Sequence, residues 1–207
     1  MSATDKEKWY NWYGNILRYL KYRKETPTEE LSKEALVKEM INSNLVNIKS
    51  ETIQIILTHP GQKYSTIANE SKKKINEVLR DDSVDELIYL ADITFIGERG
   101  VTYQESVKKA LEDFKSTNNR IWVQIRPYTI FTLDILASTE SARHRRLDQE
   151  EVKKELEETF TPLVSLPRIK EWDPQVVWIG ARAGEIIAVD RLSGSVGIQT
   201  VLRRVIL

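Results

Sequence analysis

The chain has 207 residues, of which 41% are hydrophobic and 30% are charged, so it can bury one large core or two small ones. Its 31 Lys and Arg residues balance its 31 Asp and Glu residues, which argues against a free-standing DNA-binding protein, because such proteins are basic overall. It contains no cysteine, which excludes disulfides, thiolate catalysis and cysteine-based zinc sites and agrees with a reducing compartment.

The N-terminal part of the sequence alternates helical and strand patterns. Apolar residues recur at helical spacing both before and after Thr26-Pro27-Thr28, which interrupts the helical pattern. β-branched apolar runs farther along indicate buried strands. The predicted helices are 5–24, from Thr28 through Ile41, 65–80 and 102–116, and the predicted strands are 52–58, 86–95 and 120–126. In the last of these strands Ile121, Val123 and Ile125 alternate with other residues, which predicts one buried face. Strands alternating with helices predict an α/β layer architecture with a central sheet.

The C-terminal part has a different character. Residues 138–146 are polar and lack apolar periodicity, so we predict a linker at 138–147 between domains at 1–137 and 148–207. A helix is predicted from Asp148 to Glu158, a short helix begins at Asp173-Pro174 with the aspartate as its cap, and Gly180 ends it in the left-handed conformation. Two strands follow at 185–191 and 198–206.

The most specific feature is a set of glycines, prolines and arginines that helix or strand periodicity does not produce. They are typical of a compact, turn-rich unit. The set is Leu166, Pro167, Arg168, Ile169, Asp173, Pro174, Gly180, Gly184, Arg191, Ser193, Gly197 and Arg203. This pattern resembles the assembly domain of the fifth subunit shared by the eukaryotic nuclear RNA polymerases, a domain that makes up the whole of the corresponding small subunit in archaeal RNA polymerase.

The chain departs from that family at several positions. The family's Arg-Pro-Ser-Glu-Thr-Ala-Gly segment is Arg191-Leu192-Ser193-Gly194-Ser195-Val196-Gly197 here, which lacks the proline and the glutamate. The usual Tyr-Arg becomes Leu202-Arg203, and a basic residue becomes Ala183. The spelling of the segment 173–178 resembles the divergent versions carried by large DNA viruses that encode their own polymerase.

The resemblance implies both a fold and a role. The fold would be α+β or α/β, with an N-terminal restriction-endonuclease-like jaw and a small β-rich assembly domain. The chain would be a non-catalytic subunit without cofactor or metal, anchored to the largest polymerase subunit beside neighbouring small subunits rather than a free homo-oligomer. The twelve residues of the pattern, together with Trp178, would form the assembly interface, where arginine and tryptophan are favoured.

The jaw of the family lies near downstream duplex DNA through a loop that reads roughly Gly-Met-Thr-Pro-Ser-Ala. The best match is at 100–105, which keeps Gly100 and Thr102. Thr102, with Lys108 and Lys109 beyond it, would contact phosphate, while Glu105 would oppose the contact. The alternative is that Thr102 only caps a helix.

Two other functions stay open from the residues alone. A nuclease would need clustered carboxylates and a lysine to hold divalent metal, and Asp81, Asp82, Asp85 and Glu86 are clustered without a suitably placed lysine. The chain could also be a free-standing interaction module. His59 and His144 have no nucleophile or carboxylate at a recognised spacing, and there is no phosphate-binding glycine loop.

The sequence also predicts location. The charged segment from Asp5 to Lys8 is unlike the apolar core of a signal peptide, and no run approaches the ~18 apolar residues of a membrane span. We therefore expect an intracellular protein without membrane contact, located with its polymerase in the nucleus or, if viral, in host cytoplasm and virion.

Overall fold

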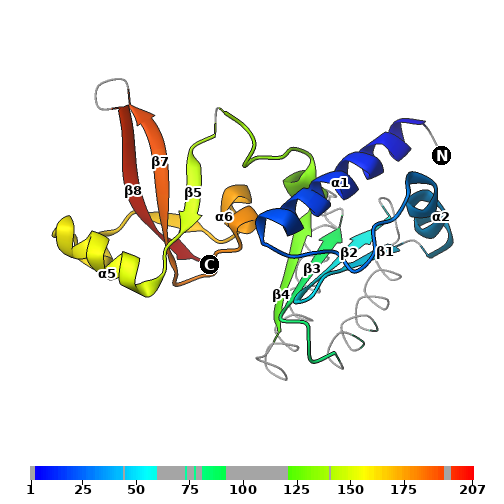
Figure 1. Cartoon of the computed structure of the whole chain (residues 1–207), viewed down its shortest axis with the longest axis horizontal. Helices are drawn as coiled ribbons and strands as arrows, with labels where there is room; N and C mark the ends of the chain where they lie inside the picture. The colour runs from blue at the N-terminus through cyan, green and yellow to red at the C-terminus, as the bar shows by residue number, and fades with distance from the viewer. Residues whose placement is uncertain are drawn as a thin grey trace, which may run out of the picture. The chain divides into compact units, whose positions relative to one another are not determined.

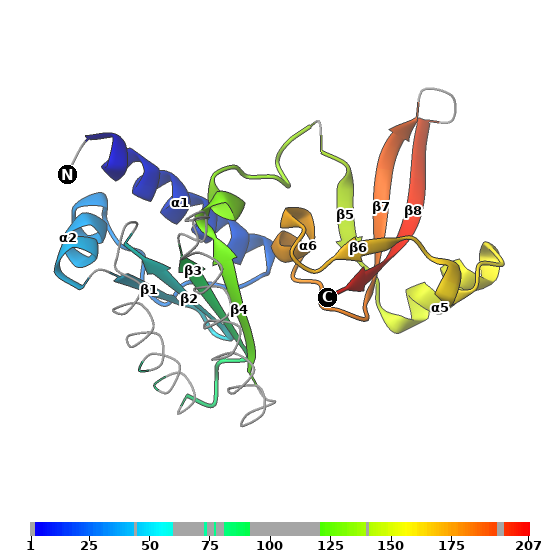
Figure 2. The same ribbon diagram turned by 180° about the vertical axis from the view of Figure 1, so that it is seen from behind.

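The structure, a computed structural model, describes residues 3–43, 45–59, 73, 77, 81–91, 121–139, 141–193 and 197–207. The chain forms two compact units, Met1–Leu133 and Asp134–Leu207, each with its own four-stranded sheet (Figures 1 and 2). Helices and mixed sheets in two units confirm the predicted α+β class. Within the described part, no helix is long and apolar enough to cross a membrane.

The first unit has a mixed sheet of strand order β1-β2-β3-β4, in which β1 is antiparallel to β2 and the other neighbours are parallel. Its elements are α1 (Ala3–Tyr22), α2 (Lys33–Ser43), β1 (Leu45–Lys49), β2 (Ile53–Thr58), β3 (Glu86–Ala91), β4 (Trp122–Pro127) and the 3-10 helix η1 (Tyr128–Phe131). All six residues of β2 are buried. Burial on both faces is expected for a central strand of a parallel sheet, and it explains the continuous apolar run that predicted this strand.

Helix α1 covers this sheet with the apolar side that its periodicity predicted. Trp9, Ile16 and Leu20 are buried, and the helix lies across the sheet in both views (Figures 1 and 2). The Asn15 side chain donates to the Phe131 carbonyl at 2.8 Å, which fixes α1 against η1.

The start of the chain differs from the prediction in one helix boundary and one additional strand. Helix α2 begins at Lys33 rather than at Thr28, because the Ser32 hydroxyl accepts from the Ala35 amide at 3.2 Å and the Thr28 amide instead donates to the Lys49 carbonyl at 2.7 Å. Strand β1 was not predicted. It is only five residues long, and its antiparallel pairing with β2 supplies the order that its own sequence does not.

Strand β4 differs from the predicted alternation. Ile121 and Val123 are buried as expected, but Gln124 is buried too, where its side-chain amide donates to Glu86 Oε1 at 2.7 Å. The predicted helix at 102–116, most of that at 65–80 and the end of the strand at 86–95 lie outside the described residues. Lys73 and Glu77 are described, and both are helical and exposed.

One carboxylate of the first unit carries a pH prediction. Glu25 accepts the Thr52 hydroxyl at 2.6 Å and the Thr52 amide at 3.1 Å. Partial burial raises the pKa of Glu25, but these hydrogen bonds outweigh it and lower the pKa below its ordinary value of 4.5. The bonds therefore stabilise the fold fully above pH 4.5, and the gain is lost as pH falls through the lowered pKa.

We expect Glu25→Gln to reduce this acid dependence. Between about pH 6 and about pH 3 the wild type should lose more free energy of unfolding than the variant, by less than about 1 kcal/mol because the group is partly solvated. Urea unfolding followed by circular dichroism at both pH values measures the difference. Equal losses in the two proteins would contradict the assignment.

The second unit is a small sheet of order β5-β7-β8-β6 with a helix on each face. Its elements are β5 (Arg143–Arg146), α5 (Gln149–Glu158), the 3-10 helix η2 (Leu163–Ser165), β6 (Arg168–Lys170), α6 (Pro174–Ile179), β7 (Ile186–Ser193) and β8 (Gly197–Ile206). Ile187 and Val189 pack with Val176 of α6, whereas Ile186 and Ala188 belong to a second cluster on the other face. The α5 residues Val152 and Leu156 cover that second cluster.

The predicted ends of the short helix are confirmed. Asp173 caps α6 by accepting from the Gln175 amide at 2.9 Å, and Pro174 takes the first helical position. Gly180 follows the helix at φ 66°, in the left-handed region that favours glycine.

The predicted linker needs correction. The two compact units meet at Leu133 and Asp134, and residues 143–146 form β5, which pairs antiparallel with β7. A basic strand at the edge of a sheet is half-exposed, so it carries no apolar periodicity by which to be found, and charged edge strands resist unwanted pairing.

Candidate assembly surface

The β7–β8 hairpin of the second unit is buried at its base and exposed at its outer end. Its strands pair from Ile186 opposite Arg204 to Ser193 opposite Gly197. On the outer sides, β5 pairs only with residues 187–190 of β7, and β6 pairs only with residues 204–206 of β8. Among the described residues, the outer part of the hairpin is thus a two-stranded ribbon (Figure 1). Such a ribbon offers both side-chain faces and unpaired backbone to another protein.

The two faces of this ribbon differ chemically. Leu192 lies directly opposite Ile198, so their side chains share a face, and they are 85% and 69% exposed. Arg191, opposite Gln199, points to the other face because successive strand residues alternate. An exposed aliphatic pair backed by an arginine combines the apolar contact and the many-donor head group typical of protein interfaces.

The arginines at the surface of this unit differ in whether their side chains have partners. Arg145 pairs with Glu151 at 3.0 Å, and Arg146 pairs with Glu185 at 2.7 Å. The Arg191 guanidinium, in contrast, has no hydrogen bond or ion pair within the described chain, and it is exposed. Arg203 is half-buried and donates to the Arg168 carbonyl at 3.3 Å, which holds β6 beside β8.

The structure separates the predicted interface residues into an inner and an outer set. Trp178 is 0% exposed and therefore cannot contact a partner directly, which corrects its place in the predicted interface. Leu166 and Gly180 are also buried, and Asp173 and Pro174 begin α6. The outer residues are Pro167, Arg168, Gly184, Arg191 and Gly197, with Ile169 and Arg203 half-buried. Ser193 ends β7 in register with Gly197.

Two outer glycines are required by backbone conformation. Gly184 has φ 97° and donates its amide to the Val205 carbonyl at 2.9 Å, and Gly197 has φ 78° where β8 begins. A Cβ at either position would meet no atom within 4 Å, so the left-handed φ, rather than lack of space, selects glycine.

Sequence reasoning missed the exposed aliphatic pair. Leu192 was noted only as a departure from the family pattern, and Ile198 was assigned only to a strand. The register across Gly197 contained the signal, because it places the two side chains opposite each other on one face.

The four residues predicted near DNA, Gly100, Thr102, Lys108 and Lys109, lie outside the described residues. Two of the four carboxylates considered for a nuclease, Asp81 and Glu86, are engaged in contacts of the fold. Glu86 is buried and pairs with Arg23 at 2.9 Å, and Asp81 binds Lys49 and Ser83.

The contacts of Asp81 also lower the pKa of its carboxyl group. Hydrogen bonding from Lys49 and then from Ser83 holds the pKa of Asp81 well below its ordinary range. Within the described ranges, no three His, Asp or Glu side chains are placed to hold a metal ion.

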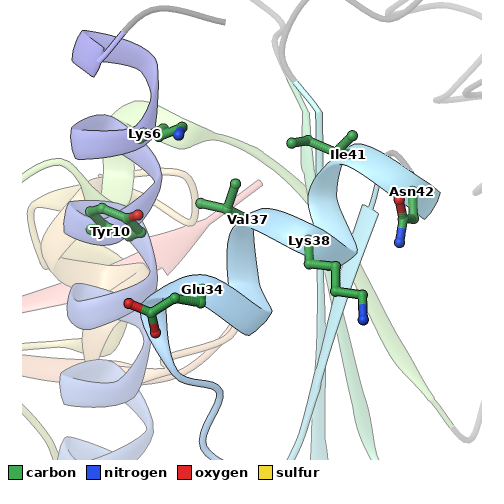
Figure 3. A pocket seen from close by; sticks show the side chains of 7 residues that line it. All are labelled: Lys6, Tyr10, Glu34, Val37, Lys38, Ile41 and Asn42. Carbon is green, nitrogen blue, oxygen red and sulfur yellow. The ribbon is translucent and has the colours of Figure 1, made fainter.

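A shallow groove lies between α1 and α2, with a volume of about 430 Å3. Figure 3 shows Val37 and Ile41 of α2 pointing toward α1, from which Lys6 points back. The full lining is Lys6, Tyr10, Glu34, Val37, Lys38, Ile41 and Asn42. Aliphatic groups beside charges of both signs do not define a particular ligand.

Comparison with known proteins gives a family match for the second unit. The family described as RNA polymerase Rpb5, C-terminal domain, matches residues 133–205. This range coincides with the second compact unit, Asp134–Leu207, which is defined by contacts alone.

Individual relatives match in two ways. The DNA-directed RNA polymerase RPB5 homolog of African swine fever virus is 24% identical over 195 residues, covering 91% of this chain and 92% of the relative. The DNA-directed RNA polymerase subunit Rpo5 of Thermococcus celer is 36% identical over 73 residues, covering 35% of this chain and 89% of the relative. The Rpo5 of Pyrococcus abyssi is 40% identical over 63 residues, covering 30% of this chain and 77% of that subunit.

Proposed function

Because the chain belongs to the Rpb5 family of DNA-directed RNA polymerase subunits, we propose that its second unit anchors it to the largest subunit of its polymerase. The archaeal relatives carry this proposal. They are polymerase subunits although they correspond to only about a third of this chain. This supports the shared part as the one that joins the complex, and the family match covers the same part, residues 133–205.

The chemistry of the second unit fits this role. The guanidinium of Arg191, which has no partner among the described residues, and the exposed pair Leu192 and Ile198 form an outer surface on a firmly packed sheet. The largest subunit would cover this surface, with neighbouring small subunits beside it. An apolar pair that is covered in the complex favours a bound subunit over a free homo-oligomer.

The first unit would form the jaw of the subunit beside downstream duplex DNA. Its proposed contact is the segment with Gly100, Thr102, Lys108 and Lys109, and the chain would need no catalytic residue, cofactor or metal of its own. The match to the African swine fever virus protein covers 91% of the chain and supports a viral subunit. We place such a subunit with its polymerase in host cytoplasm and virion, whereas a cellular subunit would be in the nucleus.

Affinity purification of the tagged chain from its native source tests the anchoring. Mass spectrometry should find the two largest polymerase subunits in stoichiometric amounts. Recovery of the chain alone at mild salt would reject the proposal and make a metal-dependent nuclease assay the next experiment.

We expect Arg191→Ala to weaken incorporation by about five- to thirty-fold, the effect of about 1–2 kcal/mol that an interface arginine contributes. The isolated variant should stay folded, because Arg191 makes no bond within the described chain. Competition between tagged wild-type and variant subunits during polymerase reconstitution measures the loss. Arg145→Ala is the matched control, and equal incorporation of all three proteins would remove Arg191 from the interface.

A further inference from the structure

The loop that follows α5 exposes three apolar side chains. Phe160 is 93% exposed, Val164 is strongly exposed, and Leu163 is about half-exposed. They lie within five residues of one another, on a loop that is otherwise well ordered by hydrogen bonds. The Thr161 amide donates to the Leu156 carbonyl at 3.2 Å, and the Ser165 amide donates to the Pro162 carbonyl at 2.9 Å.

The backbone at Phe160 is unusual for its residue type. Phe160 has φ 49° and is the first residue after the Thr159 cap of α5. Its amide donates to the Glu157 carbonyl at 3.3 Å, which together with the Thr161 bond forms the helix end that normally takes glycine at this position. A bulky residue in the left-handed region is strained, and here the strain holds an aromatic ring out in solvent.

The adjoining end of α5 also opposes helix stability. Its last turn carries Glu155, Glu157 and Glu158 and no basic residue, although the helix dipole disfavours negative charge at this end. Lys153 and Lys154 reach Glu157 and Glu158 only at 3.9 and 3.8 Å, on the exposed surface. The ring therefore projects from a negatively charged helix end.

We propose that the loop Phe160–Val164 with the end of α5 is a docking element for a second polymerase subunit, one whose surface has an apolar pocket edged by Lys and Arg. Acidic and apolar groups at one place fit a basic rim around an apolar pocket. The left-handed Phe160 and the acidic last turn both destabilise the free chain at the same helix end, and both are explained if binding to a partner compensates for them. The element lies apart in sequence from the hairpin of the anchoring surface, and the inference rests on the proposed polymerase membership.

Two substitutions separate docking from folding. Phe160→Gly removes the ring and the strain, so the melting midpoint of the second unit should rise by roughly 2–5 °C, whereas Phe160→Ala removes the ring and keeps the strain. Both should reduce retention in the polymerase by about five- to thirty-fold. Loss with alanine alone would show that retention follows stability and would overturn the proposal, as would full retention of both.

A separate variant tests the acidic last turn of α5. E155Q/E157Q/E158Q relieves the unfavourable dipole contact, so the free chain should be at least as stable as the wild type, while retention should fall by several-fold. Unchanged retention would overturn the basic-rim requirement.

Photo-crosslinking in the reconstituted polymerase identifies the partner. p-Benzoylphenylalanine at position 160 should cross-link to a Lys- or Arg-containing peptide of another subunit, and the same residue at position 192 reports on the hairpin. Cross-links from 192 but none from 160, or links from 160 to a second copy of this chain, would overturn the docking element and leave the anchoring standing. Failure of the wild-type chain to enter the polymerase would reject both.

Discussion

Replacing Trp178 with alanine is expected to destabilise the second unit severely and to weaken the incorporation of the chain into its polymerase. Trp178 is fully buried on the six-residue helix α6, beside the buried Val176 and Val177. Truncation of a buried Trp costs about 3–5 kcal/mol, because both the apolar transfer and the packing around the ring are lost. A unit of this size has a total stability of about 4–11 kcal/mol, so the loss is a large share of it.

Urea unfolding of the whole chain, followed by circular dichroism, measures this effect. Trp172→Ala is the control on the same segment. Trp172 is exposed and its ring meets only the Lys170 ammonium, at 5.3 Å, among its contacts within the described residues, so its loss should cost about 1 kcal/mol or less. Similar losses in the two variants would contradict the central place of Trp178 in the core.

The contrast between these tryptophans shows what the sequence could not decide. Trp172 and Trp178 flank the same Asp173-Pro174 turn, and tryptophan is common both in cores and at interfaces. The fold buries Trp178 completely on α6 and leaves Trp172 exposed. The role of a single aromatic side chain therefore depended on tertiary contacts that local spacing does not contain.

Features with a local cause were predictable. Helix α1 follows from apolar periodicity, and the ends of α6 follow from Asp173 and Gly180, which satisfy backbone groups of the helix, and from Pro174, whose fixed φ suits the first helical position. The long strands β7 and β8 were also predicted nearly to their observed bounds.

Features that depend on strand pairing or on an unusual backbone conformation were missed. Strands β1, β5 and β6 have three to five residues, and each is ordered by pairing with a longer strand, which is the next strand in sequence for β1 and lies farther along the chain for β5 and β6. The exposed pair Leu192 and Ile198 likewise depends on hairpin register, and the exposed Phe160 depends on a left-handed φ that its residue type argues against.

The first unit contains a buried ion pair whose disruption should be as costly as the loss of Trp178. Glu86 begins β3 and is almost completely buried, with one oxygen 2.9 Å from Arg23 and the other accepting from Gln124 at 2.7 Å and from Tyr19 at 3.3 Å. Arg23 also donates to the Tyr19 hydroxyl, so α1 is connected to the sheet through this network. Removing one partner leaves a buried charge without compensation, which costs about 3–5 kcal/mol.

We therefore expect Arg23→Met to destabilise the first unit by about 3–5 kcal/mol and the double variant R23M/E86Q to recover about 2–3 kcal/mol of the summed losses, because the stranded charge is gone. Urea unfolding of wild type, both single variants and the double variant gives the coupling energy. Lys49→Met is the matched control, since its pair with Asp81 is much more exposed, is screened by solvent and should therefore contribute far less than the buried pair. A coupling energy for Arg23 and Glu86 no larger than this exposed pair would mean that the network contributes little to the fold. A large coupling energy would show that Glu86 has a structural role. A carboxylate held in this way argues against a metal-dependent nuclease site on this sheet.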